Sequence, residues 1–388
     1  MDAFRLTGIL AALVMACGSA ATAAAQDSEN AIEIGTMFNT TGAIAPLGAP
    51  SDKGAKLAIA EINENGGVLG RKLLQKDAPT NSVLSDIHEA SHKLVSDNPD
   101  LVGVVGFVDS GSLLAAAPDI VDAGMTFMTS GATSPQLPSE IPNYLYLACF
   151  GDNVQAAAAA QWVYEEQKAR YVTVYVETDK LYPRLLQGYF RASFEMYGGV
   201  VRAVHAVDPS DTTGKIRIPQ ASDVVFLSTE TAENAVVVAR KLREHGYQGL
   251  IVGGDGYDAP EVWAANPDLG DIVYTTHAYL GESNKSELVR AFVSDYEAAY
   301  PGETPTAFAA LAYDAIGLVK AAIERSGDAT RDGLLQGLAG LENYNGVTGT
   351  ISYKQGSRIP LKSVTLMGVD KGKLHYVGKI TPRLVATP

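Results

Sequence analysis

Short apolar segments alternate with amphipathic helical segments along most of this chain. Residues 101–106 are continuously apolar, which suits a parallel strand covered on both faces, and a helical pattern begins at Ser110. The same strand-then-helix unit recurs at residues 170–176 and 181–197. Regular alternation of this kind predicts an α/β fold in which right-handed helical crossovers join parallel strands.

The chain is too long for one compact core, and its strand–helix pattern starts twice. Its 388 residues suit two domains, and the first set of strands and helices ends near residue 150. The last third has two long helices, at 285–300 and 306–326, so we expect the chain to return to the first lobe near residue 278. The predicted lobes are 27–148 with 279–350, and 149–278 with 351–388.

The N-terminus has the pattern of an export signal. Arg5 precedes an apolar run at 6–16 that is too short to span a bilayer, and small residues lead to a cleavage site after Ala25. We therefore expect residues 1–25 to be a signal peptide and the mature protein to lie in the periplasm. The alternative is lipid attachment at Cys17, although Met15 fits a lipoprotein motif poorly.

Composition excludes several classes of protein. A net charge of −14 argues against binding to nucleic acid or to anionic lipid. No segment after the signal reaches about 18 apolar residues, the length that a membrane span needs. Cleavage leaves Cys149 without a partner for a disulfide, and we expect it to be a buried small hydrophobe. No phosphate-binding loop or dinucleotide motif is present, so we predict neither a cofactor nor an enzyme.

One motif favours a different class, an exported zinc hydrolase. Residues 88–92 spell His-Glu-Ala-Ser-His, and on a helix His88 and His92 share a face that can bind zinc. Val95 stands where one family of such enzymes has glycine, and the apolar stripe of the helix places both histidines beside it, toward solvent. The zinc enzyme is thus the distant alternative.

Three polar loops follow predicted strands at the edge of the sheet where α/β proteins bind ligands. They are residues 109–112, 130–133 and 253–256. Hydroxyl groups and free backbone N–H groups at a helix start suit a carboxylate, while Asp255 suits an ammonium group. Each loop also has a purely structural interpretation, since Ser110 and Thr133 can be helix caps and the glycine-rich loop can be a tight turn.

Several segments in order resemble the branched-chain-amino-acid type of periplasmic binding proteins, which serve ABC transporters. The matching segments are 41–42, 54–72, 131–135, 253–256, 312–315 and 345–352. The resemblance covers roughly residues 31–380. It implies two Rossmann-like lobes with parallel sheets, joined by three hinge crossings and closing on a small molecule. It also implies a membrane permease as partner, and we expect a monomer.

The resemblance also implies roles for individual residues. Ser110 and Thr133 would hold a ligand carboxylate by hydroxyl and backbone N–H groups. The carbonyl group of Gly131 would accept a hydrogen bond from the ammonium group, with which Asp255 would pair. Tyr182 would close over the ligand from the second lobe.

This chain departs from the family pattern at the side-chain end of the expected pocket. Leu47 stands where some members have an aromatic contact, and residues 228–231, with Glu230, replace a loop that often offers an aromatic. Glu230 favours a ligand with a second donor or positive group if it points inward, and is otherwise a solvated loop acid. The ligand is therefore an amino acid or a similar molecule, or alternatively an aromatic or aliphatic carboxylate. A sensor protein that feeds a receptor is a further possibility that the sequence leaves open.

Overall fold

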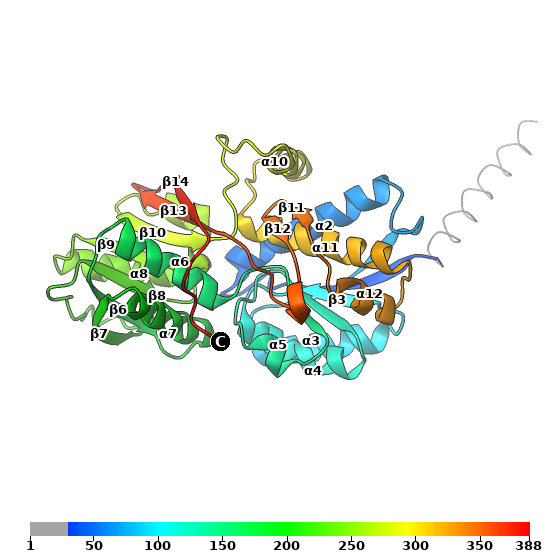
Figure 1. Cartoon of the computed structure of the whole chain (residues 1–388), viewed down its shortest axis with the longest axis horizontal. Helices are drawn as coiled ribbons and strands as arrows, with labels where there is room; N and C mark the ends of the chain where they lie inside the picture. Colours follow the sequence, from blue (N-terminus) through cyan, green and yellow to red (C-terminus); the bar gives the residue numbers. More distant parts are fainter. Residues whose placement is uncertain (1–29) are drawn as a thin grey trace, which may run out of the picture.

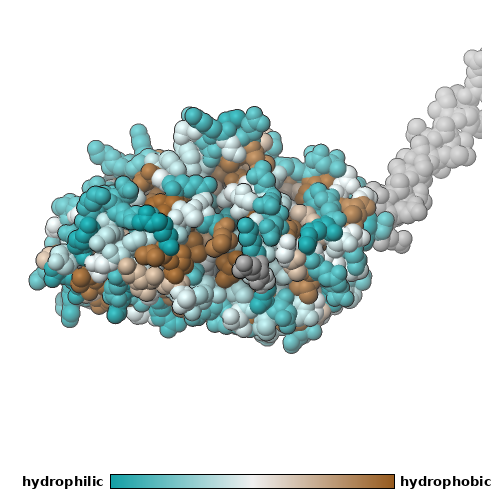
Figure 2. Space-filling view, in the orientation of Figure 1, coloured by the Kyte–Doolittle hydropathy of each residue, from teal (hydrophilic) through white to brown (hydrophobic). Residues whose placement is uncertain are grey.

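The computed structural model describes residues 30–388, which form two α/β lobes lying side by side (Figure 1). The predicted signal peptide and Cys17 lie outside the described residues. Within residues 30–388, none of the helices combines the length and the apolar character that a membrane crossing requires. Apolar side chains gather near the middle of the face in Figure 2, where the lobes meet, and polar side chains cover much of the rest.

A sheet of five parallel strands forms the centre of the first lobe. In spatial order the strands are β2 (Leu73–Asp77), β1 (Ile32–Met37), β3 (Gly103–Gly106), β4 (Thr126–Thr129) and β5 (Leu145–Leu147). Successive residues of β3 face opposite sides, so Val104 and Val105 belong to different core clusters. Both faces of this sheet are therefore buried.

Helices cover the two faces of the first sheet. On one side lie α2 (Ala45–Glu64), α11 (Ala307–Ser326) and α12 (Arg331–Leu338), and on the other α3 (Leu84–Asp97), α4 (Ser110–Asp122) and α5 (Leu137–Glu140). A small hairpin of β11 (Tyr344–Gly346) and β12 (Gly349–Ile351) follows α12. Helix α10 (Glu287–Ala299) lies outside these layers and packs on α2 and α11 through Phe292 and Tyr296.

The second lobe is built around a sheet of seven strands. In spatial order they are β14 (Lys373–Ile380), β13 (Val364–Asp370), β10 (Gly270–Thr276), β9 (Leu250–Gly253), β8 (Val224–Ser228), β6 (Tyr171–Glu177) and β7 (Val200–Val207). Strand β13 runs antiparallel to both neighbours, and the remaining pairs are parallel. Helices α6 (Asp152–Glu165) and α7 (Leu181–Met196) cover one face, and α8 (Ala232–Glu244) and α9 (Pro260–Ala264) the other.

The chain passes between the lobes three times, after β5, after β10 and after β12. The predicted fold class is therefore confirmed. The contacts of Tyr353 and Arg358 bear on where the third passage begins, which was predicted at residue 351. Tyr353 belongs to the first lobe's core and donates a hydrogen bond to the carbonyl oxygen of Leu147 at 2.9 Å, and Arg358 donates to the carbonyl oxygens of Ile141 and Pro138. We therefore propose that the second lobe resumes after Arg358 and not at residue 351.

Two elements have weak local signals in the sequence. Helix α2 begins at Ala45 and contains Ser51, whose hydroxyl group donates to the carbonyl oxygens of Leu47 and Phe308. Prolines at 46 and 50 make the start of α2 resemble a loop in the sequence. Pro46, however, occupies one of the first two helical positions, where no backbone N–H is needed. Strand β10 was missed, although β9 and β13 both pair with it.

A closed acidic cavity between the lobes

A small cavity lies between the lobes, where strands of both sheets end. The free space inside it is about 20 Å³, room for about one water molecule. A larger cleft of about 520 Å³ adjoins it, and Ile44, Asp109, Tyr182 and Glu230 border both spaces. The structure is therefore closed at the inner cavity, and a ligand needs the lobes to open. The cavity is lined by Ile44, Leu47, Val108, Asp109, Ser110, Thr133, Tyr182, Glu230, Asp255, Gly256 and Phe308.

Six of the seven residues predicted for the site line this one cavity. Ser110, Thr133 and Asp255 come from loops after β3, β4 and β9, as the rule for parallel sheets requires. Tyr182 lies on α7, in the second lobe. Leu47, on α2, packs in the same core cluster as Phe308 and forms the apolar wall with it. Glu230 points into the cavity from the loop after β8, so it is not simply a solvated loop acid.

Gly131, the seventh predicted residue, does not line the cavity but lies directly beside its wall. A Cβ atom at this position would stand 2.7 Å from the ring of Phe308, so any larger residue would displace that ring. Its backbone N–H donates to the carbonyl oxygen of Phe107 at 3.2 Å. The role of its own carbonyl group toward a ligand ammonium stays a prediction.

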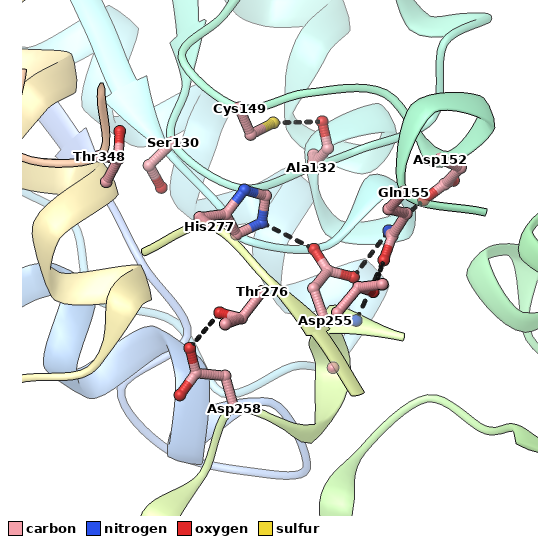
Figure 3. A network of polar contacts seen from close by, with 12 residues as sticks. Ser130, Ala132, Cys149, Asp152, Gln155, Asp255, Asp258, Thr276, His277 and Thr348 are labelled. Atoms are coloured by element: carbon pink, nitrogen blue, oxygen red, sulfur yellow. Dashed lines mark hydrogen bonds and ion pairs between the residues drawn. The ribbon is translucent and has the colours of Figure 1, made fainter. Parts of the chain in front are cut away.

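Asp255 is held by three donor groups of the protein, of which Figure 3 labels Gln155 and His277. Its Oδ1 accepts from the hydroxyl of Tyr182 at 2.7 Å and from the Gln155 amide at 2.9 Å, and its Oδ2 lies 2.8 Å from Nε2 of His277. Glycine at 254 permits this approach, because a Cβ atom there would lie 2.1 Å from the Tyr182 hydroxyl oxygen. Asp255 is thus a fixed acceptor whose hydrogen bonds do not depend on a ligand.

A second buried acid, Asp152, stands beside Asp255 at the start of α6. Its Oδ1 accepts from the amide of Gln155 at 2.9 Å, and its side chain bonds with that of Thr133, while its Oδ2 is buried without a partner in the described part of the chain. Burial, and then the charge of Asp255, raises the pKa of Asp152 to about 8. The cavity therefore borders on a second carboxyl group that the sequence motifs did not reveal, and below about pH 8 that group holds a proton.

The two hydroxyl groups predicted to bind a carboxylate, those of Ser110 and Thr133, differ in their hydrogen bonds within the protein. The hydroxyl oxygen of Ser110 accepts from the backbone N–H of Ser134 at 3.2 Å, which leaves its own proton for a ligand. The Thr133 side chain bonds with Asp152 and lowers that residue's pKa, as a hydroxyl donating to a carboxylate would do. Ser110 is therefore the better placed of the two donors.

The two histidines of the zinc motif lie on α3, far out in solvent, with side chains 61% and 73% exposed. Their Nδ1 atoms lie 3.4 and 2.9 Å from the carboxylate of Asp119. Across residues 30–388, no three histidine, cysteine or acidic side chains are grouped so that they could hold a metal ion. The geometry of His88 and His92 thus gives the zinc-hydrolase alternative no support.

The family comparisons agree with this architecture. A family model described as "Periplasmic binding protein" matches residues 31–373. The chain belongs to this family. A Leu/Ile/Val-binding protein, BraC3 of Rhizobium johnstonii, is 28% identical over 351 residues, which span 88% of this chain and 93% of that protein.

Two solved structures are similar to this periplasmic binding protein along almost their whole length. LivJ of Streptococcus pneumoniae, a branched-chain amino acid transporter substrate-binding protein in complex with isoleucine, has a TM-score of 0.82 at 26% identity and covers 91% of this chain and all of that one. The leucine-binding protein LivK of Thermotoga maritima has a TM-score of 0.81 at 26% identity, with 90% and 99% covered. The resemblance inferred from the sequence is confirmed.

The polar residues Asp152, Gln155 and His277, around the cavity of this periplasmic binding protein, were missed from the sequence. Gln155 links Asp152 to Asp255 and also accepts from Thr275 at 2.6 Å. His277, at the second passage between the lobes, stacks on Phe150 with ring centroids 4.0 Å apart. The only sequence signal for these residues was that their polar side chains lie next to the predicted passages near residues 150 and 278. No local pattern showed that these two segments would lie together.

Proposed function

We propose that this protein is the extracytoplasmic solute-binding component of an ABC uptake system, and that it binds an amino acid by closure of the two lobes. The proposal is carried by the placement of Ser110 and Asp255 on one cavity from different lobes. A hydroxyl donor at a helix N-terminus suits a carboxylate, and a fixed buried carboxylate suits an ammonium group. The relatives named for leucine, isoleucine and valine binding support the same ligand class.

The proposal extends to partners and location. We infer that the closed form delivers its ligand to a membrane permease, that the protein acts as a monomer, and that it is exported to the periplasm by residues 1–25. Hinge closure of two lobes around a ligand is a known way for such proteins to signal occupancy. The net charge of −14 is consistent with a protein that remains free of anionic lipid surfaces.

One observation favours the second candidate, a carboxylate ligand without an ammonium group. Both oxygens of Asp255 already have donors within the protein, so an ammonium is not needed to keep this acid paired. Against it stand oxygens of Asp152 and Glu230 that have no partner in the described part of the chain, because an ammonium group can donate to such oxygens and a ligand without one cannot. An amino acid carries its own positive group and satisfies both requirements.

A thermal-shift and calorimetry screen of the purified protein tests the proposal. The twenty amino acids form one arm, and benzoate and 4-methylpentanoate, which lack the ammonium group, form the other. An amino acid present at 100 times its Kd should stabilise the protein by about 2.7 kcal/mol. Asp255→Asn should weaken that binding at least tenfold, since a hydrogen bond to a charged group contributes about 1.5–3 kcal/mol. Binding of the ammonium-free acids alone would contradict the proposal.

A further inference from the structure

Glu230 is a partly exposed acid whose buried oxygen, Oε2, has no partner in the described part of the chain. It lies between β8 and α8, and its backbone N–H donates to Oε2 of Glu177 at 2.8 Å. Its own Oε2 is buried and accepts no hydrogen bond from any residue in the described range 30–388. Unpaired carboxylate oxygens are costly to bury, so this oxygen is available to a donor group that a ligand brings.

The charges around Glu230 are mostly of the same sign. Burial raises the pKa of Glu230 well above its usual range, and the charges of Asp109 and Glu177 raise it further. Asp109 is fixed, because its carboxylate accepts from the backbone N–H of Ser112 at 2.8 Å and from Asn39 at 3.1 Å. Lys180 lowers the pKa, but its own ion pair is with Asp179, at 3.9 Å.

Glu230 and Asp109 also stand at the boundary between the inner cavity and the outer cleft. Asp109 reaches this boundary from the first lobe and Glu230 from the second, together with Ile44 and Tyr182. A ligand whose amino and carboxylate groups lie inside, near Asp255 and Ser110, would therefore extend its side chain between these two acids. An aliphatic side chain in this position would bury Glu230 without a partner.

We propose that the ligand is an amino acid with a positively charged side chain, whose second cationic group binds between Glu230 and Asp109. This inference rests on the proposed function and names the ligand class for the same site. Glu230 then determines specificity, because it strengthens the binding of a cationic side chain and weakens the binding of an apolar one. Ornithine, lysine and arginine have the required chemistry, and norleucine has an apolar side chain of similar length.

Isothermal titration at 150 mM salt with L-ornithine, L-lysine, L-arginine and L-norleucine tests the inference. At least one basic amino acid should bind the unaltered protein ten or more times more tightly than norleucine. Glu230→Gln should weaken that binding at least tenfold and change norleucine binding less than twofold. The matched control is Glu233→Gln, an exposed acid of the outer cleft, which should change all four affinities less than threefold.

Each result has a distinct meaning. If norleucine or leucine binds as tightly as the basic amino acids, or if Glu230→Gln weakens both classes equally, the inference about Glu230 is wrong while the proposed amino-acid binding stands. If no amino acid binds and benzoate does, both fail. The buried Oε2 of Glu230 has no partner within residues 30–388 that the glutamine would lose, so the variant should fold, and its melting temperature checks this directly.

Discussion

The imidazole of His277 joins Asp255 to the passages between the lobes. Its Nε2 lies 2.8 Å from Oδ2 of Asp255, and its ring stacks on Phe150 at a centroid distance of 4.0 Å. Phe150 lies at the first passage and His277 at the second. Through His277, Asp255 is therefore in contact with the first two of the three passages between the lobes.

Replacing His277 by phenylalanine should destabilise the protein by about 1–3 kcal/mol. The new ring can still stack on Phe150, but the buried Oδ2 of Asp255 loses its donor. Urea unfolding measures the loss, and His245→Phe, at an exposed helix end, is the control. The double variant with Asp255→Asn should cost less than the sum of the single variants. Strict additivity would show that the two side chains are not coupled.

Ser110→Ala should weaken ligand binding about tenfold with a smaller effect on stability. The hydroxyl proton that this serine offers to a ligand carboxylate disappears, and a hydrogen bond to a charged group contributes about 1.5 kcal/mol or more. Titration calorimetry with the ligand identified in the screen provides the affinity. Ser85→Ala, on the exposed start of α3, should leave it unchanged. An unaltered affinity in Ser110→Ala would remove this residue from the site.

Asp152 should make the ligand-free protein less stable as the pH rises. Its pKa is about 8 in the folded protein against 3.8 for an ordinary aspartate, so the folded state holds a proton that the unfolded state releases between these values. The resulting stability is fully present below about pH 4 and is lost as the pH rises through about 8.

The effect is measured as the difference between the unaltered protein and Asp152→Asn. Between pH 5 and 7.5 the free energy of unfolding of the unaltered protein should fall relative to the variant, on the order of 1 kcal/mol per pH unit. The exposed Asp122→Asn should show no such trend. Parallel curves for Asp152→Asn and the unaltered protein would mean that the acid is not protonated in the fold.

Glu230→Gln should stabilise the ligand-free protein by about 1 kcal/mol at pH 8. The substitution removes a carboxylate whose buried oxygen has no partner in the described part of the chain and whose nearest ionised neighbours include Asp109 and Glu177. Urea unfolding without ligand provides the comparison, with Glu233→Gln as control. A loss of stability in Glu230→Gln alone would show that Glu230 has a favourable partner inside the protein.

Most of the fold could be predicted because its signals are local. Strands such as β3 are continuous apolar runs, and helices such as α8 place apolar residues on one face. One strand is an exception. Strand β10 combines Gly270, Asp271 and two threonines with only a short apolar centre, so its identity depends on pairing with β9 and β13.

Residues of the site could be predicted only where they directly follow the carboxyl end of a parallel strand. Ser110, Thr133 and Asp255 follow the carboxyl ends of parallel strands, and topology alone brings them together. Gln155 and His277 could not be found in this way, because one starts a helix and the other ends a strand, about 120 residues apart in the chain. They come together only through Asp255, to which both side chains bond once the second sheet has formed.

The discontinuous lobes have a consequence for biosynthesis. The first lobe lacks the core contributed by α11 and α12 until residue 338 has been made, and the second lacks β13 and β14 until residue 380. Neither lobe can therefore complete its folding while much of the chain is still on the ribosome. A nascent chain with this order of elements can complete the cores of both lobes only after its last strands have been made.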